Sequence, residues 1–329
     1  MRVAIVYNIA AAVVSGNRDD LASDREMELI PGLVADELTR RGHATCLIPA
    51  SWDVGRACQA AGVDIALNLA EGFAGTNGHE HLVPSLLDFA EIPYTGADAT
   101  NMLILRDKAF TKNILKAHGV RAPAHQLFTR PTERRDQGLA FPLILKPIRE
   151  EASIGIRFSS VVCNDADLTR RLAELLSDYR QPVLSEEFVR GRELSVGVWG
   201  NSSPETLPVC EFTFFDTDPL RQFRSFEYKW LGEQEAMSAP TDLSTPVRET
   251  LEATAKLAHV IFRCRDYSRA DFRLSPEGEV YFLEHNFNPG IGPNSRGLSN
   301  TFTKMAEFGG IPFGDMLERL IVMAVSRYA

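Results

Sequence analysis

The chain has 329 residues, more than one hydrophobic core usually supports, so we expect two or three domains separated by clefts. Hydrophobic residues make up 44% and charged residues 24%, the proportions of a folded protein without long disorder. The formal net charge of −9 disfavours nucleic acid and anionic membrane surfaces as partners. No stretch of about 18 apolar residues occurs, so we expect neither a membrane span nor a signal peptide.

The cysteines are odd in number, scattered along the chain and free of CxxC spacing: Cys46, Cys58, Cys163, Cys210 and Cys264. This usage disfavours a disulfide framework and a zinc knuckle. A reducing cytoplasm is the compartment that it predicts.

The first part of the chain alternates apolar strand patterns with helical ones. Strands are predicted at residues 3–6, 44–48 and 65–69, and helices at residues 26–41 and 54–61. The first helix is expected to place Leu29, Leu33 and Leu38 on one side and to stop at Gly42. Strands that alternate with helices predict a parallel sheet.

From Lys108 onward the pattern indicates a small α+β lobe and then a larger one. The small lobe is predicted from helices at 108–118 and 166–179, strands at 143–146 and 156–162, and a Ser/Gly turn at 153–155. The larger lobe is predicted from strands at 183–188, 194–199, 270–274 and 280–283, and helices at 249–262 and 313–328. Residues 211–240 are aromatic and lack clear periodicity, which is typical of a working loop or lid.

Oxygen-bearing side chains are concentrated on the last two predicted strands. Glu284 and Asn286 are two residues apart, so both can share a face with Asp271 on the neighbouring strand. Three such oxygen ligands suit Mg²⁺, and Arg269 would lie on the same face. A half-buried hairpin with a wet acidic face explains the two carboxylates equally well. It does not explain why Asn286 leads into the turn at residues 288–293.

Two lysines and a small-residue turn suggest a phosphate site. Lys108 begins a helix, and Lys146 ends a buried strand just before the turn at residues 149–155. A lysine there costs desolvation unless it meets an anion, and the turn supplies backbone N–H groups. Either lysine alone also fits an ordinary surface residue.

Residues 183–193 form a strand that continues into an extended segment, whose backbone could bind an adenine edge while Glu193 binds a ribose. A solvated charged loop would look the same. The P-loop, dinucleotide-fold, zincin and serine-hydrolase motifs are all absent, which excludes those classes. The run from His79 to His81 contains three consecutive residues that can bind metals, but a polar start of a helix explains it better.

The order of these motifs resembles the D-alanine–D-alanine ligase branch of the ATP-grasp superfamily over the whole chain. The resemblance is carried by the following segments: Glu71-Gly72, Ile92 to Gly96, Asp107-Lys108 with Lys112, Leu145 to Pro147, Ser153 to Gly155, Glu186 to Phe188, Gly191 to Glu193, Lys229, Arg269 to Phe272, and Glu284 to Gly290. It implies an α/β fold in three parts, a parallel-sheet domain at 1–106, a central lobe at 107–185 and a catalytic lobe at 186–329.

The resemblance also implies ATP and two Mg²⁺ ions, which Mn²⁺ could replace, between the central and catalytic lobes. The metal ligands would be Asp271, Glu284 and Asn286. The nucleotide would be bound by Lys108, Lys146, Glu186, Glu187, Phe188, Val189, Glu193 and Lys229. Arg269, Ser153 and Lys229 would serve the reaction, in which a carboxylate becomes an acyl phosphate that an amine attacks.

The substrate positions depart from the family pattern. The substrate residues implied by the resemblance are Asp24, Glu71, Trp230, Gly290, Ser295 and Arg296. Asp24 stands nearest to a family glutamate that binds the first amino group. Ala152 and Trp230 replace the serine and tyrosine that support that glutamate. Ser295 would help to bind the second substrate's carboxylate, and Arg296 replaces an aliphatic residue.

These changes predict a carboxylate–amine ligase whose first substrate is not D-alanine. An authentic D-alanine–D-alanine ligase of peptidoglycan synthesis and a non-catalytic nucleotide-binding regulator are the alternatives. The expected partners are a small carboxylate and a small amine, with no nucleic acid and no membrane. The resemblance suggests a cytoplasmic protein and a homodimer, and the sequence leaves the substrates' identities open.

Overall fold

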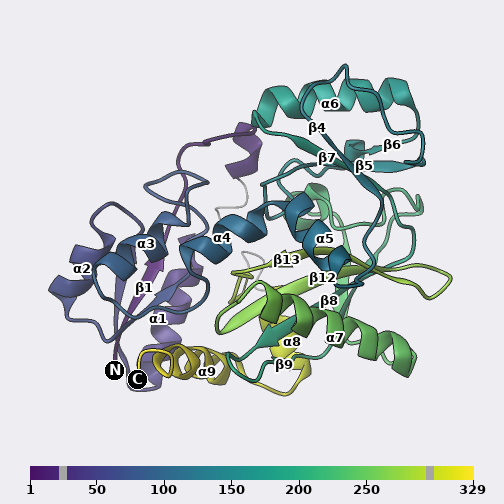
Figure 1. Cartoon of the computed structure of the whole chain (residues 1–329). Helices are drawn as coiled ribbons and strands as arrows, with labels where there is room; N and C mark the ends of the chain where they lie inside the picture. Colours follow the sequence, from purple (N-terminus) through teal and green to yellow (C-terminus); the bar gives the residue numbers. More distant parts are fainter. Residues whose placement is uncertain (22–27, 294–299) are drawn as a thin grey trace.

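A computed structural model describes residues 1–21, 28–293 and 300–329, and it contains three sheets with helices packed on them (Figure 1). The first sheet has the parallel order β2-β1-β3, formed by β1 (Arg2–Tyr7), β2 (Ala44–Pro49) and β3 (Ile65–Asn68). Val3 and Ile5 of β1 pack on one side of this sheet, and Ala4 and Val6 pack on the other. Both faces are therefore buried, as is usual for parallel sheets.

Helices from distant parts of the chain cover this sheet. α1 (Ile30–Arg40) and α9 (Phe313–Val325) share one core with it, and α2 (Val54–Ala61) and α3 (Leu82–Phe89) share the other. The predicted apolar side of the first helix was wrong, because Leu29 and Leu33 are 55% and 42% exposed. The buried side instead carries Ile30, Val34 and Leu38, which follow the i, i+4 spacing of a helix.

Two capped helices connect the first sheet to the second. α4 (Ala99–Arg106) begins at Asp98, whose carboxylate accepts a bond from the Asn101 N–H at 2.8 Å. α5 (Lys108–Ala117) begins at Asp107, whose carboxylate accepts one from the Phe110 N–H at 2.9 Å. These caps satisfy backbone donors that a helix start leaves free, and they fix where α5 begins.

The central sheet is antiparallel in the order β4-β7-β5-β6 and packs against α6 (Asp165–Tyr179). Its strands are β4 (His125–Phe128), β5 (Leu143–Pro147), β6 (Val161–Val162) and β7 (Val183–Glu187). The strand predicted at residues 156–162 is mostly absent from it. Ser160 accepts a bond from the Arg157 N–H at 3.0 Å and closes a short 3-10 helix there, a local bond that competes with strand pairing.

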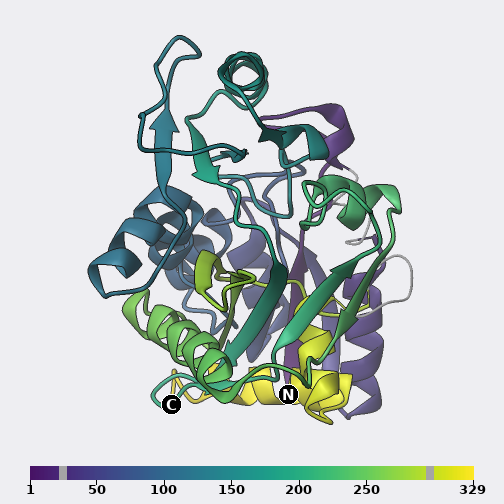
Figure 2. The same ribbon diagram turned by 90° about the vertical axis from the view of Figure 1, so that its right-hand side faces the viewer.

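The third sheet has the order β11-β10-β8-β12-β13, with the short β9 paired to β8. Its strands are β8 (Arg192–Trp199), β9 (Glu205–Thr206), β10 (Cys210–Phe214), β11 (Glu235–Ser238), β12 (Tyr267–Leu274) and β13 (Val280–Asn286). α7 (Thr245–Ile261) shares a core with one face, and α8 (Thr301–Phe308) contacts β8 and β10. In Figure 2 the central sheet stands above the other two, with α6 seen end-on.

The segment at 211–240 is more regular than its sequence suggests, because it includes β11, most of β10 and a helical turn at Glu227–Leu231. Throughout the described part of the chain, no helix is both long and apolar enough to cross a membrane.

Asp266 joins the first and third parts of the structure. Its carboxylate is fully buried and accepts bonds from the Gly96 N–H at 2.8 Å and the Asn201 amide at 3.1 Å. Arg327, which follows α9, pairs with the same carboxylate at 2.8 Å. A buried carboxylate with this many charge-assisted bonds is expensive to disrupt.

We therefore expect Asp266→Asn to lower the free energy of unfolding by about 3 kcal/mol, because the half-buried Arg327 would lose its counter-charge. Asp315→Asn is the matched control, since Asp315 pairs with Arg41 at 2.7 Å but is 54% exposed. That change should cost less than about 1 kcal/mol. Urea unfolding of both variants tests the difference, and equal losses would contradict the role given to Asp266.

Candidate functional site

One cavity is lined by residues from all three parts of the chain. The first part contributes residues near the end of β3, a loop and the end of α4, and the central part contributes Lys146 and the turn at 149–156. The third part contributes the cleft side of β8, β12 and β13. The lining residues include Glu71, Lys146, Glu151, Ala152, Ser153, Glu186, Glu187, Phe188, Val189, Glu193, Arg224, Lys229, Arg269, Asp271, Arg273, Glu284, Asn286 and Gly290.

Successive side chains of β12 point to opposite sides of the sheet, one toward the cavity and the next toward the hydrophobic core. Ala270 and Phe272 pack in the core with α7, and Arg269, Asp271 and Arg273 line the cavity. β13 runs antiparallel beside it, with Glu284 opposite Asp271 and Asn286 opposite Arg269. A bulge follows Asp271.

The predicted cluster of Arg269, Asp271, Glu284 and Asn286 is therefore assembled at the cavity. The Arg269 guanidinium donates two hydrogen bonds of 2.8 Å to the Asp271 carboxylate, and the Asn286 amide donates to the same carboxylate at 2.8 Å. This leaves the carbonyl oxygen of Asn286 as its unused acceptor. Two carboxylates and one amide oxygen form a donor set that fits a hard cation such as Mg²⁺.

A buried cluster of lysines and glutamates forms the opposite wall. Lys112 on α5 and Lys146 on β5 each pair with a different oxygen of Glu186 at 2.7 Å. Burial alone would raise the pKa of Glu186, but the charges and hydrogen bonds of the two lysines lower it to about 2. Glu186 is therefore ionised, and its side chain is engaged in holding α5, β5 and β7 together.

Lys108 lies one helical turn before Lys112 and bridges two other elements. Its ammonium donates to the Glu150 carbonyl at 2.7 Å and pairs with Glu284 at 3.1 Å. Burial would raise the pKa of Glu284, but Lys108 and Lys146 lower it to about 2. The nearest lysine thus keeps this carboxylate charged.

Glu193 is held in place by residues that the sequence analysis did not select. The carboxylate accepts bonds from Arg273 at 3.1 Å and from the Arg224 N–H at 3.1 Å. Burial nonetheless raises the pKa of Glu193. Glu187, Phe188 and Val189 line the same end of the cavity.

The turn predicted to bind phosphate is joined to the segment that follows β10. Ala152 and Ser153 have left-handed backbones, with φ of 55° and 61°. The Ser153 hydroxyl donates to the Arg224 carbonyl at 2.9 Å, and the Trp230 indole N–H donates to the Ala152 carbonyl at 2.8 Å. The Lys229 ammonium lies 4.8 Å from the centre of the Trp230 ring. The two replaced positions, Ala152 and Trp230, are thus bonded to each other.

Some predicted substrate residues line the cavity and others lie outside the described residues. Glu71 and Gly290 line the cavity. Trp230 is not among the lining residues, but its indole N–H donates to the carbonyl of Ala152, which is. Asp24, Ser295 and Arg296 fall within residues 22–27 and 294–299, which the structure does not describe.

Glu151 is a further cavity residue that was not selected from the sequence, besides Arg224 and Arg273. Its side chain makes no hydrogen bond or ion pair with any described residue, and burial raises its pKa to about 7 despite nearby Lys108. Glu80 also raises this pKa. The signal was visible in the sequence, because an acid inside a turn expected to cradle an anion is out of place.

Comparison with known proteins agrees with this arrangement. Residues 114–322 match the family model described as the D-ala D-ala ligase C-terminus. A D-alanine–D-alanine ligase of Bordetella avium is 31% identical over 281 residues, which cover 83% of this chain and 84% of the relative.

Solved structures share the fold at lower identity. The crystal structure of the D-alanine–D-alanine ligase from Bacillus anthracis complexed with ATP has a TM-score of 0.75 and 18% identity, and covers 99% of this chain and 98% of its own. The VanG D-Ala:D-Ser ligase from Enterococcus faecalis has a TM-score of 0.74 and 18% identity, with coverage of 98% and 99%. The expected ATP-grasp fold is therefore confirmed. The chain belongs to the D-alanine–D-alanine ligase family of ATP-dependent, ADP-forming carbon–nitrogen ligases.

Proposed function

We propose that this ligase activates the carboxylate of a small amino-acid-like substrate other than D-alanine and joins it to a small amine. The observation that carries the proposal is the changed wall beside the phosphate turn. There, Glu151 is a half-buried carboxylate whose side chain has no hydrogen-bond or ion-pair partner among the described residues, and Trp230 is bonded to the backbone of Ala152. The wall therefore offers a different charge and shape to the first substrate.

ATP is proposed to lie between the central sheet and the third sheet. Lys108 and Lys146 are directed toward its phosphates, and the backbone from Glu186 to Val189 toward its adenine. Glu193, oriented by Arg273, is suited to accept the ribose hydroxyls. Lys229 is proposed to reach the γ-phosphate from the segment between β10 and β11. Support comes from the cavity, which all these residues except Lys108 line.

Asp271, Glu284 and Asn286 are proposed to hold two Mg²⁺ ions, which Mn²⁺ could replace, because their donor set is made of oxygen. The metal would neutralise phosphate charge. In the reaction, a carboxylate oxygen attacks the γ-phosphorus and ADP leaves. The amine nitrogen then attacks the acyl carbon, loses a proton, and displaces phosphate. Arg269, fixed by Asp271, is proposed to stabilise the charge that develops in both steps.

The first substrate's cation is proposed to bind near Glu151. A buried carboxylate without a partner is stabilised when a cation arrives, which makes it a suitable receptor for an ammonium group. Glu71 and Gly290 are proposed to contact the substrates from the other side of the cavity. The roles given to Asp24, Ser295 and Arg296 stay predictions.

The three sheets support a division into domains at 1–106, 107–185 and 186–329, which we propose as the functional units. Each would supply one wall of the cavity. We also propose that the protein is cytoplasmic, because its cysteines are free, and that it is a homodimer, by analogy with the family.

Arg269→Ala should reduce kcat by a factor of about 10² or more, as expected for the loss of one preorganised charge donor. ATP affinity should change little, because the nucleotide's proposed contacts lie elsewhere. Phosphate release and calorimetric ATP binding test these expectations, with Arg269→Lys as the charge-preserving comparison. Near-normal turnover of the alanine variant would show that Arg269 is structural.

The ligand-free protein should lose stability as pH rises through the titration of Glu151. Its folded pKa of about 7 lies above the usual 4.5, so the unfolded chain gives up this proton first. Glu151→Gln should therefore match the wild type near pH 4 and exceed it near pH 8, by on the order of 1–3 kcal/mol. Exposed Glu249→Gln should follow the wild type throughout. Parallel curves for Glu151→Gln and the wild type would contradict the burial argument.

D-Alanine should be a poor first substrate. A badly paired buried ammonium costs about 1–3 kcal/mol, or roughly a tenfold to hundredfold loss of affinity. Competition kinetics against larger amino and keto acids, with the product masses measured, test this expectation. If D-alanine has the highest kcat/KM of the panel, the protein is instead a D-alanine–D-alanine ligase of peptidoglycan synthesis.

The Glu151→Gln variant, measured with the same panel of first substrates, tests the proposed ammonium site. It should raise KM for the preferred amine-bearing substrate about tenfold, while the apparent affinity for ATP stays constant. An unchanged KM would remove Glu151 from the substrate site without affecting the ligase assignment.

A further inference from the structure

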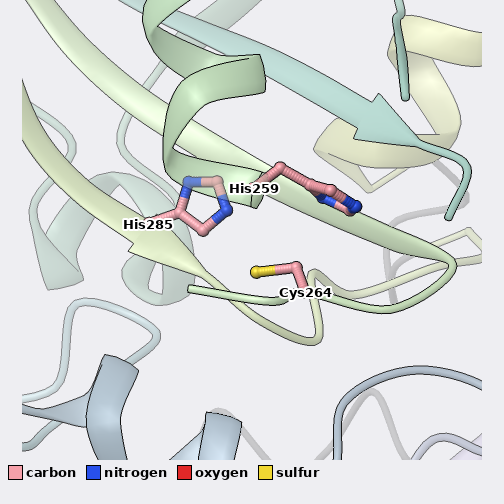
Figure 3. Close-up of side chains that lie close together, drawn as sticks. All are labelled: His259, Cys264 and His285. Atoms are coloured by element: carbon pink, nitrogen blue, oxygen red, sulfur yellow. The ribbon is translucent and has the colours of Figure 1, made fainter. Parts of the chain in front are cut away.

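Three potential metal ligands meet on the side of β12 and β13 that faces α7 (Figure 3). His259 comes from the end of α7, Cys264 from the turn that follows it, and His285 from β13. One ligand atom of each lies within 4.8 Å of the others, and the residues are only 1%, 7% and 3% exposed. The cluster is separate from the cleft, because His285 is flanked by Glu284 and Asn286, which line the cavity instead.

His285 is the unexplained member of this cluster. Neither ring nitrogen has a hydrogen-bond partner within the described residues, although the side chain is buried. Leaving a buried polar group unsatisfied costs about 1–3 kcal/mol. An imidazole whose two nitrogens lack partners can offer a lone pair to a ligand.

His259 is already oriented as a ligand. One ring nitrogen, Nε2, is 3.0 Å from the Gly200 carbonyl, which can only accept, so Nε2 carries the proton. Nδ1 therefore presents its lone pair, which lies 2.6 Å from the Ser268 hydroxyl. A backbone carbonyl that fixes one imidazole nitrogen while the other binds is the usual support of a metal-ligating histidine.

Cys264 supplies a sulfur ligand. Its thiol is free and buried, with the Asn101 amide 3.8 Å away. Burial raises the pKa of this thiol, so it is protonated until a cation takes the proton's place. Asp98 and Asp266 act electrostatically on Cys264 and His259, which places negative charge near the cluster.

We propose that His259, Cys264 and His285 bind one Zn²⁺ ion, with the Ser268 hydroxyl as the fourth donor. Two imidazoles and a thiolate favour zinc over Mg²⁺ or Ca²⁺, which prefer oxygen. Bond lengths of about 2.0–2.3 Å require ligand atoms roughly 3.3–3.8 Å apart, so the side chains need to close by about 1 Å. The ion would tie α7, its following turn, β12 and β13 together behind the catalytic strand.

Cobalt substitution tests the proposal, because a Co²⁺–thiolate charge-transfer band reports sulfur coordination and an oxygen site in the cleft gives none. The full chain, stripped by a chelator, should bind one equivalent of Co²⁺ with this band and lose it when Zn²⁺ is added. His285→Val and Cys264→Ala should each abolish the band. Cys58→Ala, which removes a buried thiol elsewhere, and Asp271→Asn in the cleft should both retain it.

A second measurement covers variants that fold poorly. Zinc should raise the thermal midpoint of the wild type, and the shift should disappear in His285→Val, since a ligand stabilises only the state that binds it. Circular dichroism establishes that each variant is folded. A wild type without the band, or a band that persists in both His285→Val and Cys264→Ala, would overturn the zinc site.

Discussion

The carboxylate of Glu186, shared between Lys112 and Lys146, is the interaction on which the rest of the cleft depends. All three groups are almost fully buried, so removing Glu186 would leave two ammonium charges uncompensated in a desolvated place. The pairing fixes α5 against β5 and β7. Because Lys108 lies one turn earlier on α5, its ammonium reaches Glu284 on the third sheet and links that sheet to the central part of the structure.

The same sheet that presents charge to the cleft also presents an apolar face to α7, and this division follows from the two-residue period of β12. Arg269 and Asp271 face the cavity, and Ala270 between them packs in the core. Substitutions on one face therefore act on the other only through the strand's position. This arrangement lets residues on the cavity face change without altering the core beneath them.

The parts of the site that the sequence could predict are those set by local spacing. Glu284 and Asn286 are two residues apart on a strand, so the sequence predicted that they share a face. Their order in the chain relative to Arg269 helped to identify the family. The bond from Trp230 to Ala152 could not be predicted, because it joins segments about 80 residues apart in the chain. Glu151 was visible as an acid in the turn, but the environment that raises its pKa is formed only by the folded chain. The prediction that Leu29 and Leu33 are buried was wrong for a related reason. The apolar character of these residues alone did not show which side of α1 packs on the sheet.

The bond between the Trp230 indole and the Ala152 carbonyl has an optical consequence. The chain has three tryptophans, and the other two lie in very different settings, Trp52 exposed and Trp199 buried under Arg319. Trp230 alone combines a hydrogen bond to the phosphate turn with a lysine ammonium over its ring. With Trp52 and Trp199 changed to phenylalanine, the remaining indole emission becomes a built-in optical probe of contact between the turn at 149–156 and the segment between β10 and β11, measurable in real time without a label.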